Sequence, residues 1–257
     1  MPRSREAKGN RDPKGDDPPQ NCTVEWPDDC KDKKGCIVSA ILNYTNILLD
    51  TSDQDKRKVD RKNATMFLLH LIGDLHQPLH AMGFEEGGNG VKVCWNKERN
   101  PTCEHSNLNL HSVWDGRIIH KLRGLPASMD NPREKVAAKQ WADELFERAQ
   151  SRATTNGPED ECADVTAGEE CILQWTKESN ALVCSHVLAR GVKFVDKNDL
   201  SEEYYEENKE LAEEQVAKAG VRLAAWLNAI AEQIQPEEHE GHLGMASKKG
   251  KVMIGDL

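Results

Sequence analysis

Two pairs of histidine and aspartate with the same spacing constrain this chain more than any other feature of its sequence. His70 and Asp74 form the first pair, and His111 and Asp115 form the second. Residues four apart lie on one face of a helix, so each pair is predicted to present an imidazole beside a carboxylate. His80 follows the first pair just after a proline, which cannot continue a helix. Imidazole and carboxylate ligands in this number are typical of a catalytic zinc site.

A hydrogen bond on a helix surface is the alternative interpretation of each pair, and for a single pair it is the commoner one. The first pair lies in an apolar stretch that contains Phe67, Leu68, Leu69, Leu71, Ile72 and Leu75, and the second pair lies beside Trp114. Buried carboxylates and imidazoles need polar partners or a metal. The semi-buried setting of both pairs therefore favours their convergence on metal.

Composition limits the class of protein. The chain has 257 residues and a formal net charge of −10, a size that is ordinary for one domain with a large core. No apolar run approaches the length of a membrane helix. The acidic balance argues against binding nucleic acid through a basic surface. It does not exclude a nucleic-acid substrate, because bound metal ions can supply positive charge.

The eight cysteines predict disulfide bonds and an oxidising compartment. No Cys-x-x-Cys motif occurs, which argues against a thiolate zinc finger or a redox site. Close sequence pairs indicate disulfide-closed loops: Cys30 with Cys36, Cys94 with Cys103, and Cys162 with Cys171. Glycosylation sequons agree with a secreted glycoprotein, and they lie at Asn21, Asn43 and Asn63. The N-terminus is charged and lacks the apolar stretch of a secretion signal, so we expect that the true beginning of the protein is missing or replaced.

Apolar periodicity predicts an all-α chain with at most one short hairpin. Helices are expected over 35–50, 52–77, 107–122, 131–153, 166–190 and 206–234, with a short strand at 91–95. The last helix is expected to bury Val216, Ala219, Leu223, Trp226, Leu227 and Ile230. Residues 1–20 and 236–257 are polar and expected to be disordered, which leaves one helical domain at 21–235. The glycines at 87–90 are expected to form a turn, and His76 is expected to make hydrogen bonds away from the motif.

Three segments in this order and spacing resemble the zinc-dependent single-strand nucleases and 3′-nucleotidases of fungi and plants, the S1/P1 type. They are residues 70–80 with the motif HLIGDLHQPLH, residues 87–89 with Gly-Gly-Asn, and residues 109–115 with NLHSVWD. The resemblance covers about residues 22–231. It implies an all-α fold, shared with bacterial zinc phospholipase C, that holds three zinc ions in a cleft.

The resemblance also implies roles for individual residues. His70 and Asp74 match ligands of one zinc site, and Asp74, the candidate catalytic residue, bridges to a second ion. His80, His111 and Asp115 match the complete protein ligand set of the remaining site. Two disulfides of the family are matched by Cys22 with Cys184 and by Cys30 with Cys36, whereas the other two cysteine pairs rest on spacing alone.

The chain departs from the family before its first cysteine. There the family supplies an N-terminal tryptophan, an aspartate and two histidines as further ligands, but no histidine precedes His70 here. We therefore expect that the site of His80, His111 and Asp115 forms and that the site of His70 and Asp74 lacks half its ligands. The chain would then bind as few as one zinc ion.

The implied function is hydrolysis of phosphodiester bonds in single-stranded DNA and RNA by a monomeric zinc endonuclease. The expected products are 5′-nucleotides, with 3′-nucleotidase activity in addition, and the activity is expected to be impaired in this truncated chain. One alternative is an inactive zinc-binding relative that binds nucleotides or single strands. Another is hydrolysis of phospholipid head groups on the same fold, although the Gly-Gly-Asn and NLHSVWD segments favour the nuclease.

Overall fold

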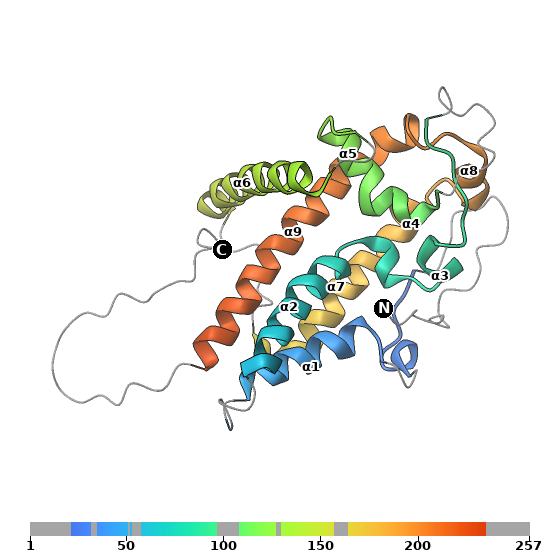
Figure 1. Cartoon of the computed structure of the whole chain (residues 1–257). Helices are drawn as coiled ribbons and strands as arrows, with labels where there is room; N and C mark the ends of the chain where they lie inside the picture. Colours follow the sequence, from blue (N-terminus) through green and yellow to red (C-terminus); the bar gives the residue numbers. More distant parts are fainter. Residues whose placement is uncertain are drawn as a thin grey trace, which may run out of the picture.

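The computed structural model describes residues 22–31, 35–50, 52, 58–96, 108–126, 130–156 and 164–234, and these residues are mostly helical (Figure 1). The five longest helices are α1 (Ile37–Leu49), α2 (Lys58–Leu75), α6 (Asn131–Asn156), α7 (Gly168–Leu182) and α9 (Glu203–Gln233). Shorter elements are η1 (Asp28–Cys30), η2 (Pro78–Ala81), α3 (Glu85–Gly88), α4 (Leu110–Ser112), η3 (Val113–Arg117), α5 (Ile118–Leu122), η4 (Val165–Ala167), η5 (Val183–Val187) and α8 (Val192–Lys197). The prediction of an all-α fold is confirmed.

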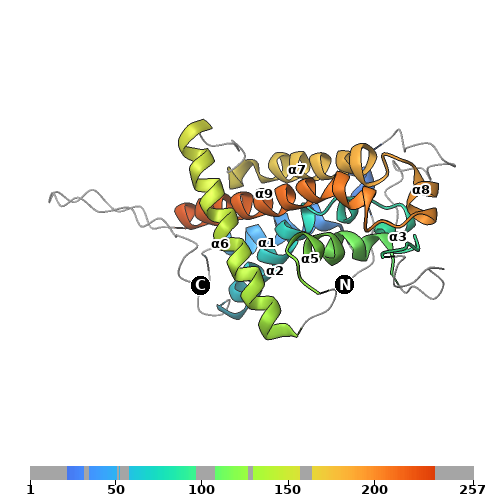
Figure 2. The same cartoon turned by 90° about the horizontal axis from the view of Figure 1, so that it is seen from above.

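The helices form a bundle around α9. Helix α1 packs along α2 and against α7, and α9 contacts α2, α5 and α6. The two views show α1, α2, α7 and α9 lying together, with α6 crossing α9 (Figures 1 and 2). The expected strand at 91–95 is wrong within the described ranges, where two isolated bridges, Lys92 with Asn109 and Cys94 with Asp199, take its place.

One hydrophobic core lies between α1, α2, α7 and the C-terminal half of α9. Its centre is the edge-to-face pair of Trp175 and Trp226, whose ring centroids are 5.5 Å apart and whose side chains are fully buried. The Nε1–H of Trp226 donates to Thr45 Oγ1 at 3.0 Å, so the one polar atom of this indole is satisfied. Packing in this core fixes the position of the C-terminal end of α2.

A second core surrounds the N-terminal half of α9. The hydroxyl of Tyr204 accepts a hydrogen bond from Trp114 Nε1 at 2.8 Å and donates one to the Val187 carbonyl at 3.0 Å. These bonds join η3, η5 and α9 in the buried interior. Leu75 at the end of α2 belongs to the first core and Leu79 in η2 belongs to the second, so the segment between α2 and η2 lies where the two cores meet.

The expected apolar face of α9 is partly wrong. Trp226 and Ile230 are buried as predicted, but Val216 is 41% exposed. The buried side of the helix includes Gln215 and Arg222, two polar side chains that apolar periodicity does not select. Both have hydrogen-bond partners in α2 or just after it, which is the condition for burying such groups.

Helix boundaries differ from the sequence expectation at several places. Asp130, one residue earlier than predicted, caps α6, because its side chain accepts from the backbone N–H of Arg133 at 3.1 Å. The single helix expected over 166–190 is three elements, η4, α7 and η5, with a wider final turn at η5. The described part of the helix expected from residue 52 is α2, Lys58–Leu75, and residues 53–57 lie outside the described residues.

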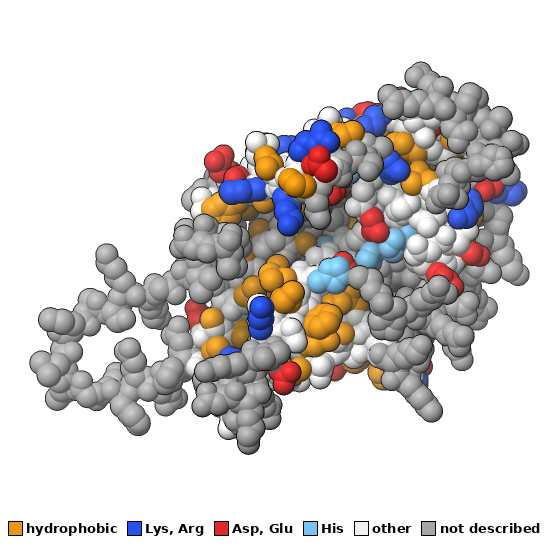
Figure 3. Space-filling model, viewed as in Figure 1, with side chains coloured by type: hydrophobic (Ala, Val, Ile, Leu, Met, Phe, Trp, Pro, Cys, Tyr) orange, Lys and Arg blue, Asp and Glu red, His pale blue; other side chains and the backbone are white. Residues whose placement is uncertain are grey.

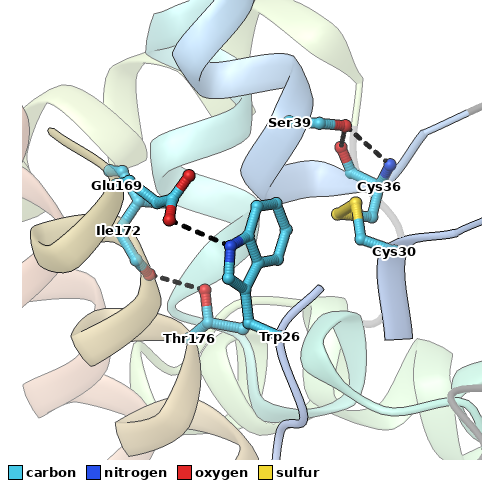
Figure 4. The surroundings of a disulfide bond; sticks show 7 residues. All are labelled: Trp26, Cys30, Cys36, Ser39, Glu169, Ile172 and Thr176. Carbon is cyan, nitrogen blue, oxygen red and sulfur yellow. Dashed lines mark hydrogen bonds between the residues drawn. A yellow bond between two sulfur atoms is a disulfide. The ribbon is translucent and has the colours of Figure 1, made fainter. Parts of the chain in front are cut away.

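Disulfides attach the N-terminal segment to the bundle. Cys22 bonds to Cys184 and Cys30 bonds to Cys36, as the family resemblance implies. Near the second disulfide, Trp26 Nε1 donates to Glu169 at 3.0 Å and so joins this segment to α7 (Figure 4). Cys94 and Cys171 are also disulfide-bonded, whereas their predicted partners, Cys103 and Cys162, lie outside the described residues.

Two of the three sequons lie on described helix surfaces. Asn43 in α1 and Asn63 in α2 are exposed, and Asn21 lies outside the described residues. Thr45 of the first sequon is buried against Trp226, so its presence has a packing reason independent of any sugar. None of the described helices is both long and apolar enough to span a membrane. The expected disordered ends, residues 1–20 and 236–257, lie outside the described chain.

Candidate metal centre

The five predicted ligands come from two stretches of the chain that meet at one place. His70 and Asp74 lie in the last turns of α2, and His80 lies in η2. His111 lies in α4, and Asp115 lies in η3. Histidine side chains are exposed on the face of the molecule shown in Figure 3, where they lie beside hydrophobic side chains.

The turn that carries His80 is built as the sequence predicts. Helix α2 ends at Leu75, and Pro78 occupies the first position of η2. The side chain of Gln77 accepts a hydrogen bond from the Leu79 backbone N–H at 2.6 Å and so caps η2. The ring of His80 is thereby directed back toward the second ligand pair.

The helical turn that carries the second pair is also capped by its own side chains. Asn109 Oδ1 accepts from the Ser112 N–H at 2.8 Å, and Ser112 Oγ accepts from the Asn109 N–H at 3.2 Å. His111 Nε2 and Asp115 Oδ2 then lie 3.2 Å apart on one face. The prediction that this pair shares a helix face is confirmed.

His80, His111 and Asp115 offer ligand atoms that all lie within 4.8 Å of one another. The rings of His80 and His111 are stacked with centroids 4.8 Å apart. The two histidine side chains are about one-fifth exposed, and Asp115 is 47% exposed. Two imidazoles and a carboxylate with one side open to solvent match a three-ligand zinc site with a free coordination position.

The electrostatics of this cluster are strongly coupled. Burial lowers the pKa of His80, but hydrogen bonds to Asp115 and Asp74 outweigh burial and raise the pKa to about 9. Burial raises the pKa of Asp115, but hydrogen bonds from His111, His80 and Gln77 outweigh it and hold this pKa well below its usual range. The carboxylate is thus ionised at neutral pH, as a metal ligand must be.

Neighbouring groups orient two of the three side chains. His111 Nδ1 lies 2.7 Å from the Gly87 carbonyl oxygen. A carbonyl can only accept, so Nδ1 carries a proton, and Nε2 is the ring nitrogen that faces Asp115 and would bind a metal. Gln77 Nε2 donates to Asp115 Oδ1 at 2.9 Å. Such outer bonds to ligand side chains are typical of metal sites.

The first pair lies next to this cluster. Asp74 Oδ2 is 3.3 Å from His70 Nε2 and 3.4 Å from His80 Nδ1, so it joins both histidines. The expected apolar surroundings are partly wrong, because Phe67 and Leu69 are 46% and 43% exposed. The His70 side chain is itself half exposed. Among the described residues, the cluster of three is the only ligand group that includes more than a pair.

Residues 14–232 match the family model described as S1/P1 nuclease. The chain belongs to the S1/P1 nuclease family. It is 38% identical over 221 residues to Nuclease S1 of Aspergillus oryzae, a match that covers 85% of this chain and 70% of the relative.

Two further relatives show how widely the similarity extends. Nuclease P1 of Penicillium citrinum is 35% identical over 217 residues, which cover 84% of this chain and 73% of the relative. Endonuclease 1 of Arabidopsis thaliana is 32% identical over 232 residues, which cover 84% of this chain and 66% of the relative. The resemblance to the fungal and plant nucleases seen in the sequence motifs is therefore confirmed.

In this S1/P1 family member, a buried polar network holds the segment between Asp74 and His80 in place. His76 is 1% exposed, and its Nδ1–H donates to the Ile72 carbonyl at 2.7 Å. Arg222 donates to His76 Nε2 at 3.1 Å and to Glu178 at 2.6 Å. Gln215 donates to the His76 carbonyl at 3.0 Å. The expectation that His76 faces away from the ligands is confirmed.

This network predicts a pH-dependent stability. Burial lowers the pKa of His76 to about 4, with the nearby Arg222 charge acting in the same direction. The unfolded chain takes up this proton near pH 6.5 and the folded chain near pH 4. Stability is therefore full above about pH 6.5 and falls, by about 3 kcal/mol from this group, as the pH is lowered to about 4.

Chemical denaturation of metal-free protein between about pH 4 and 7 measures this effect. The His76→Gln variant, which keeps a donor and an acceptor but cannot titrate, is the matched control. The difference in unfolding free energy between the two proteins should change with pH over this window. A constant difference would contradict the assignment.

Sequence reasoning missed the groups that hydrogen-bond to the candidate ligand side chains and orient them. Gln77 lies within the motif that contains His70 and His80, and a polar side chain just before a proline was a usable signal. The Gly87 carbonyl was not recognisable, because any residue carries a carbonyl. His120 bonds to Pro126 and lies 3.4 Å from Glu134. The described structure places it with those groups, outside the ligand cluster.

Proposed function

We propose that this chain is a zinc-dependent nuclease that hydrolyses phosphodiester bonds in single-stranded nucleic acid and releases 5′-nucleotides. The observation that carries the proposal is the convergence of His80, His111 and Asp115, with their outer hydrogen bonds, in a member of the S1/P1 nuclease family. Removal of the 3′-phosphate from nucleotides is proposed as a second reaction of the same site.

The donor set fits zinc. His111 presents Nε2 because its Nδ1 is engaged by Gly87, and Asp115 is ionised and held by Gln77. His80 is oriented in a similar way: its Nδ1 lies 3.4 Å from Asp74 Oδ2, and its Nε2 faces Asp115. Because these carboxylates raise the pKa of His80 to about 9, zinc would displace a proton from Nε2 on binding. When bound, zinc supplies positive charge for the substrate phosphate and makes a bound water acidic near neutral pH.

The side chains around this cluster have separate proposed roles. Asp74 orients His80 and, with His70, offers a carboxylate and an imidazole to a second ion beside the first. Gln77 keeps the Asp115 carboxylate turned toward the two histidines. Because the protein is acidic overall, the metal is the source of attraction for the phosphate at this site.

The number of zinc ions is the first quantity to measure. Elemental analysis of the folded chain after removal of loosely bound metal, together with hydrolysis of single-stranded DNA, tests the proposal. We expect at least one tightly bound zinc ion and hydrolysis that is lost with a chelator and restored by zinc. A protein that binds no zinc, or that cleaves equally well after metal removal, would contradict it.

A second candidate function is binding of nucleotides or single strands without turnover. The specific observation in its favour is that, among the described residues, His70 and Asp74 are joined by no third ligand of their own. This candidate predicts one zinc ion per chain and retention of single-stranded DNA without cleavage. A zinc count of about three with hydrolysis would exclude it and support the full family mechanism.

The proposed setting is the secretory pathway or the outside of the cell, with one helical domain at 21–235. The two disulfides whose partners are both described, Cys22–Cys184 and Cys30–Cys36, support an oxidising compartment. Glycosylation is proposed at Asn43 and Asn63, which are exposed. Mass spectrometry of protein secreted from a eukaryotic host measures both the disulfides and the sugars.

A further inference from the structure

Helix α3 is a left-handed turn. Glu85, Glu86, Gly87 and Gly88 have consecutive φ angles of 45°, 55°, 66° and 80°. For a residue with a side chain this conformation costs roughly 1–2 kcal/mol. Two glutamates in such a run persist only where their surroundings determine the backbone, and such strain is concentrated at functional sites.

Local hydrogen bonds close the turn. The Gly88 N–H donates to the Phe84 carbonyl at 3.0 Å, and Asn89 Nδ2 donates to the Glu86 carbonyl at 2.8 Å. The glutamate side chains are exposed, whereas the two glycines are buried. The turn therefore hides its glycine backbone in the protein and leaves its acidic side chains in solvent.

The buried side of the turn packs against the residue that precedes His80. A Cβ atom on Gly87 would lie 2.7 Å from the carbonyl oxygen of Leu79, a contact that real Cβ atoms do not make. A Cβ atom on Gly88 would lie 3.3 Å from the Leu79 side chain. Glycine at position 87 thus allows the turn to approach η2 at its backbone.

The same turn bonds to the segment that carries the other two ligands. The Gly87 carbonyl accepts from His111 Nδ1 at 2.7 Å. Asn89 Oδ1 accepts from Nδ2 of Asn109, the residue that caps α4, at 3.3 Å. One short turn therefore contacts both stretches of the chain that supply ligands.

We propose that the left-handed turn Glu85–Gly88 is the positioning element of the metal site. Its Gly87 carbonyl holds the His111 ring in the Nδ1–H form with Nε2 toward the metal, and its close contact with Leu79 sets the separation between His111 and His80. This inference rests on the proposed zinc site. Partners of this kind typically contribute 10- to 100-fold to metal affinity.

Gly87→Ala tests the proposal. The added methyl group must move the turn away from Leu79, and the left-handed φ angle is unfavourable for alanine. We expect zinc affinity, measured by competition with a chromophoric chelator, to fall roughly 10- to 100-fold. The absorption bands of the cobalt-substituted protein should also shift, because the ligand geometry changes.

Two control variants separate positioning from general destabilisation. Gly220→Ala lies in α9 with nothing within 4 Å of the added Cβ, so zinc affinity should not change. Glu86→Gly removes an exposed side chain from a residue with φ of 55°, so the metal-free protein should become more stable. Gly87→Ala and Glu86→Gly, the two variants within the turn, are thus expected to change the unfolding free energy of the metal-free protein in opposite directions.

The unaltered protein supplies a measurement that does not depend on how a variant folds. Long-range ¹H–¹⁵N spectra of the zinc-loaded chain should show His111 protonated at Nδ1 only. Protonation at Nε2, or unchanged zinc affinity in folded Gly87→Ala, would overturn the positioning role alone. Failure of the unaltered chain to bind zinc would instead contradict the proposed function, so the two failures are distinguishable.

Discussion

Replacing His80 with alanine is expected to lower the zinc affinity of the chain by more than about 100-fold. This is a larger loss than the removal of a hydrogen-bond partner of a ligand typically causes. His80 is one of three side chains whose ligand atoms lie within 4.8 Å of one another. Without it, His111 and Asp115 remain as two ligands, fewer than a stable zinc site uses. Competition titration against a chromophoric chelator at neutral pH measures the change, and hydrolysis of single-stranded DNA should fall with it.

His186→Ala is the matched control for this experiment. The His186 ring contacts the adjacent Ser185 hydroxyl at 2.9 Å and lies in η5, outside the ligand cluster. Its removal should leave zinc affinity unchanged. Circular dichroism of both variants confirms that each is folded. Equal zinc affinity in the His80→Ala and unaltered proteins would exclude His80 as a ligand.

Replacing Trp226 with alanine is expected to lower the free energy of unfolding by about 4 kcal/mol, within the range for large-to-small changes in cores. The indole is fully buried, packs edge-to-face on Trp175 and donates to Thr45. Its loss leaves a cavity between α1, α7 and α9 and an unpaired hydroxyl at Thr45. Chemical denaturation monitored by circular dichroism measures this effect.

Trp141→Ala provides the comparison for the core variant. Trp141 lies in α6, is only partly buried, and donates to Glu213 at 3.0 Å. Its loss should cost about 1 kcal/mol, because less apolar area leaves water and the hydrogen bond is partly exposed. A Trp226→Ala cost no larger than that of Trp141→Ala would contradict the central place of Trp226 in the core.

The ligand pairs were accessible from sequence because they depend on local geometry. Helical spacing alone places His111 beside Asp115, and Pro78 alone ends the helix before His80. The motif order also identified the family. What local geometry could not supply was the meeting of η2 with α4, because contacts between distant segments depend on how the helices pack.

The last helix shows where periodicity stops being informative. Apolar spacing selected Trp226 and Ile230 correctly, but it also selected Val216, which is 41% exposed. It passed over Arg222, which is buried because His76 and Glu178 accept its hydrogen bonds. Burial of a polar side chain depends on partners from other elements, and those partners are far away in the sequence.

By itself, the sequence determined the all-α class, most of the helical segments and the two ligand pairs, since these follow from spacing and caps within a few residues, and its motifs identified the family. The family resemblance named His80, His111 and Asp115 as one site, but only the tertiary structure shows them meeting, with ligand atoms within 4.8 Å of one another. It also decided the left-handed turn at Glu85–Gly88. The physical reason is that strained backbone and buried polar groups are stable only where distant segments supply the compensating contacts.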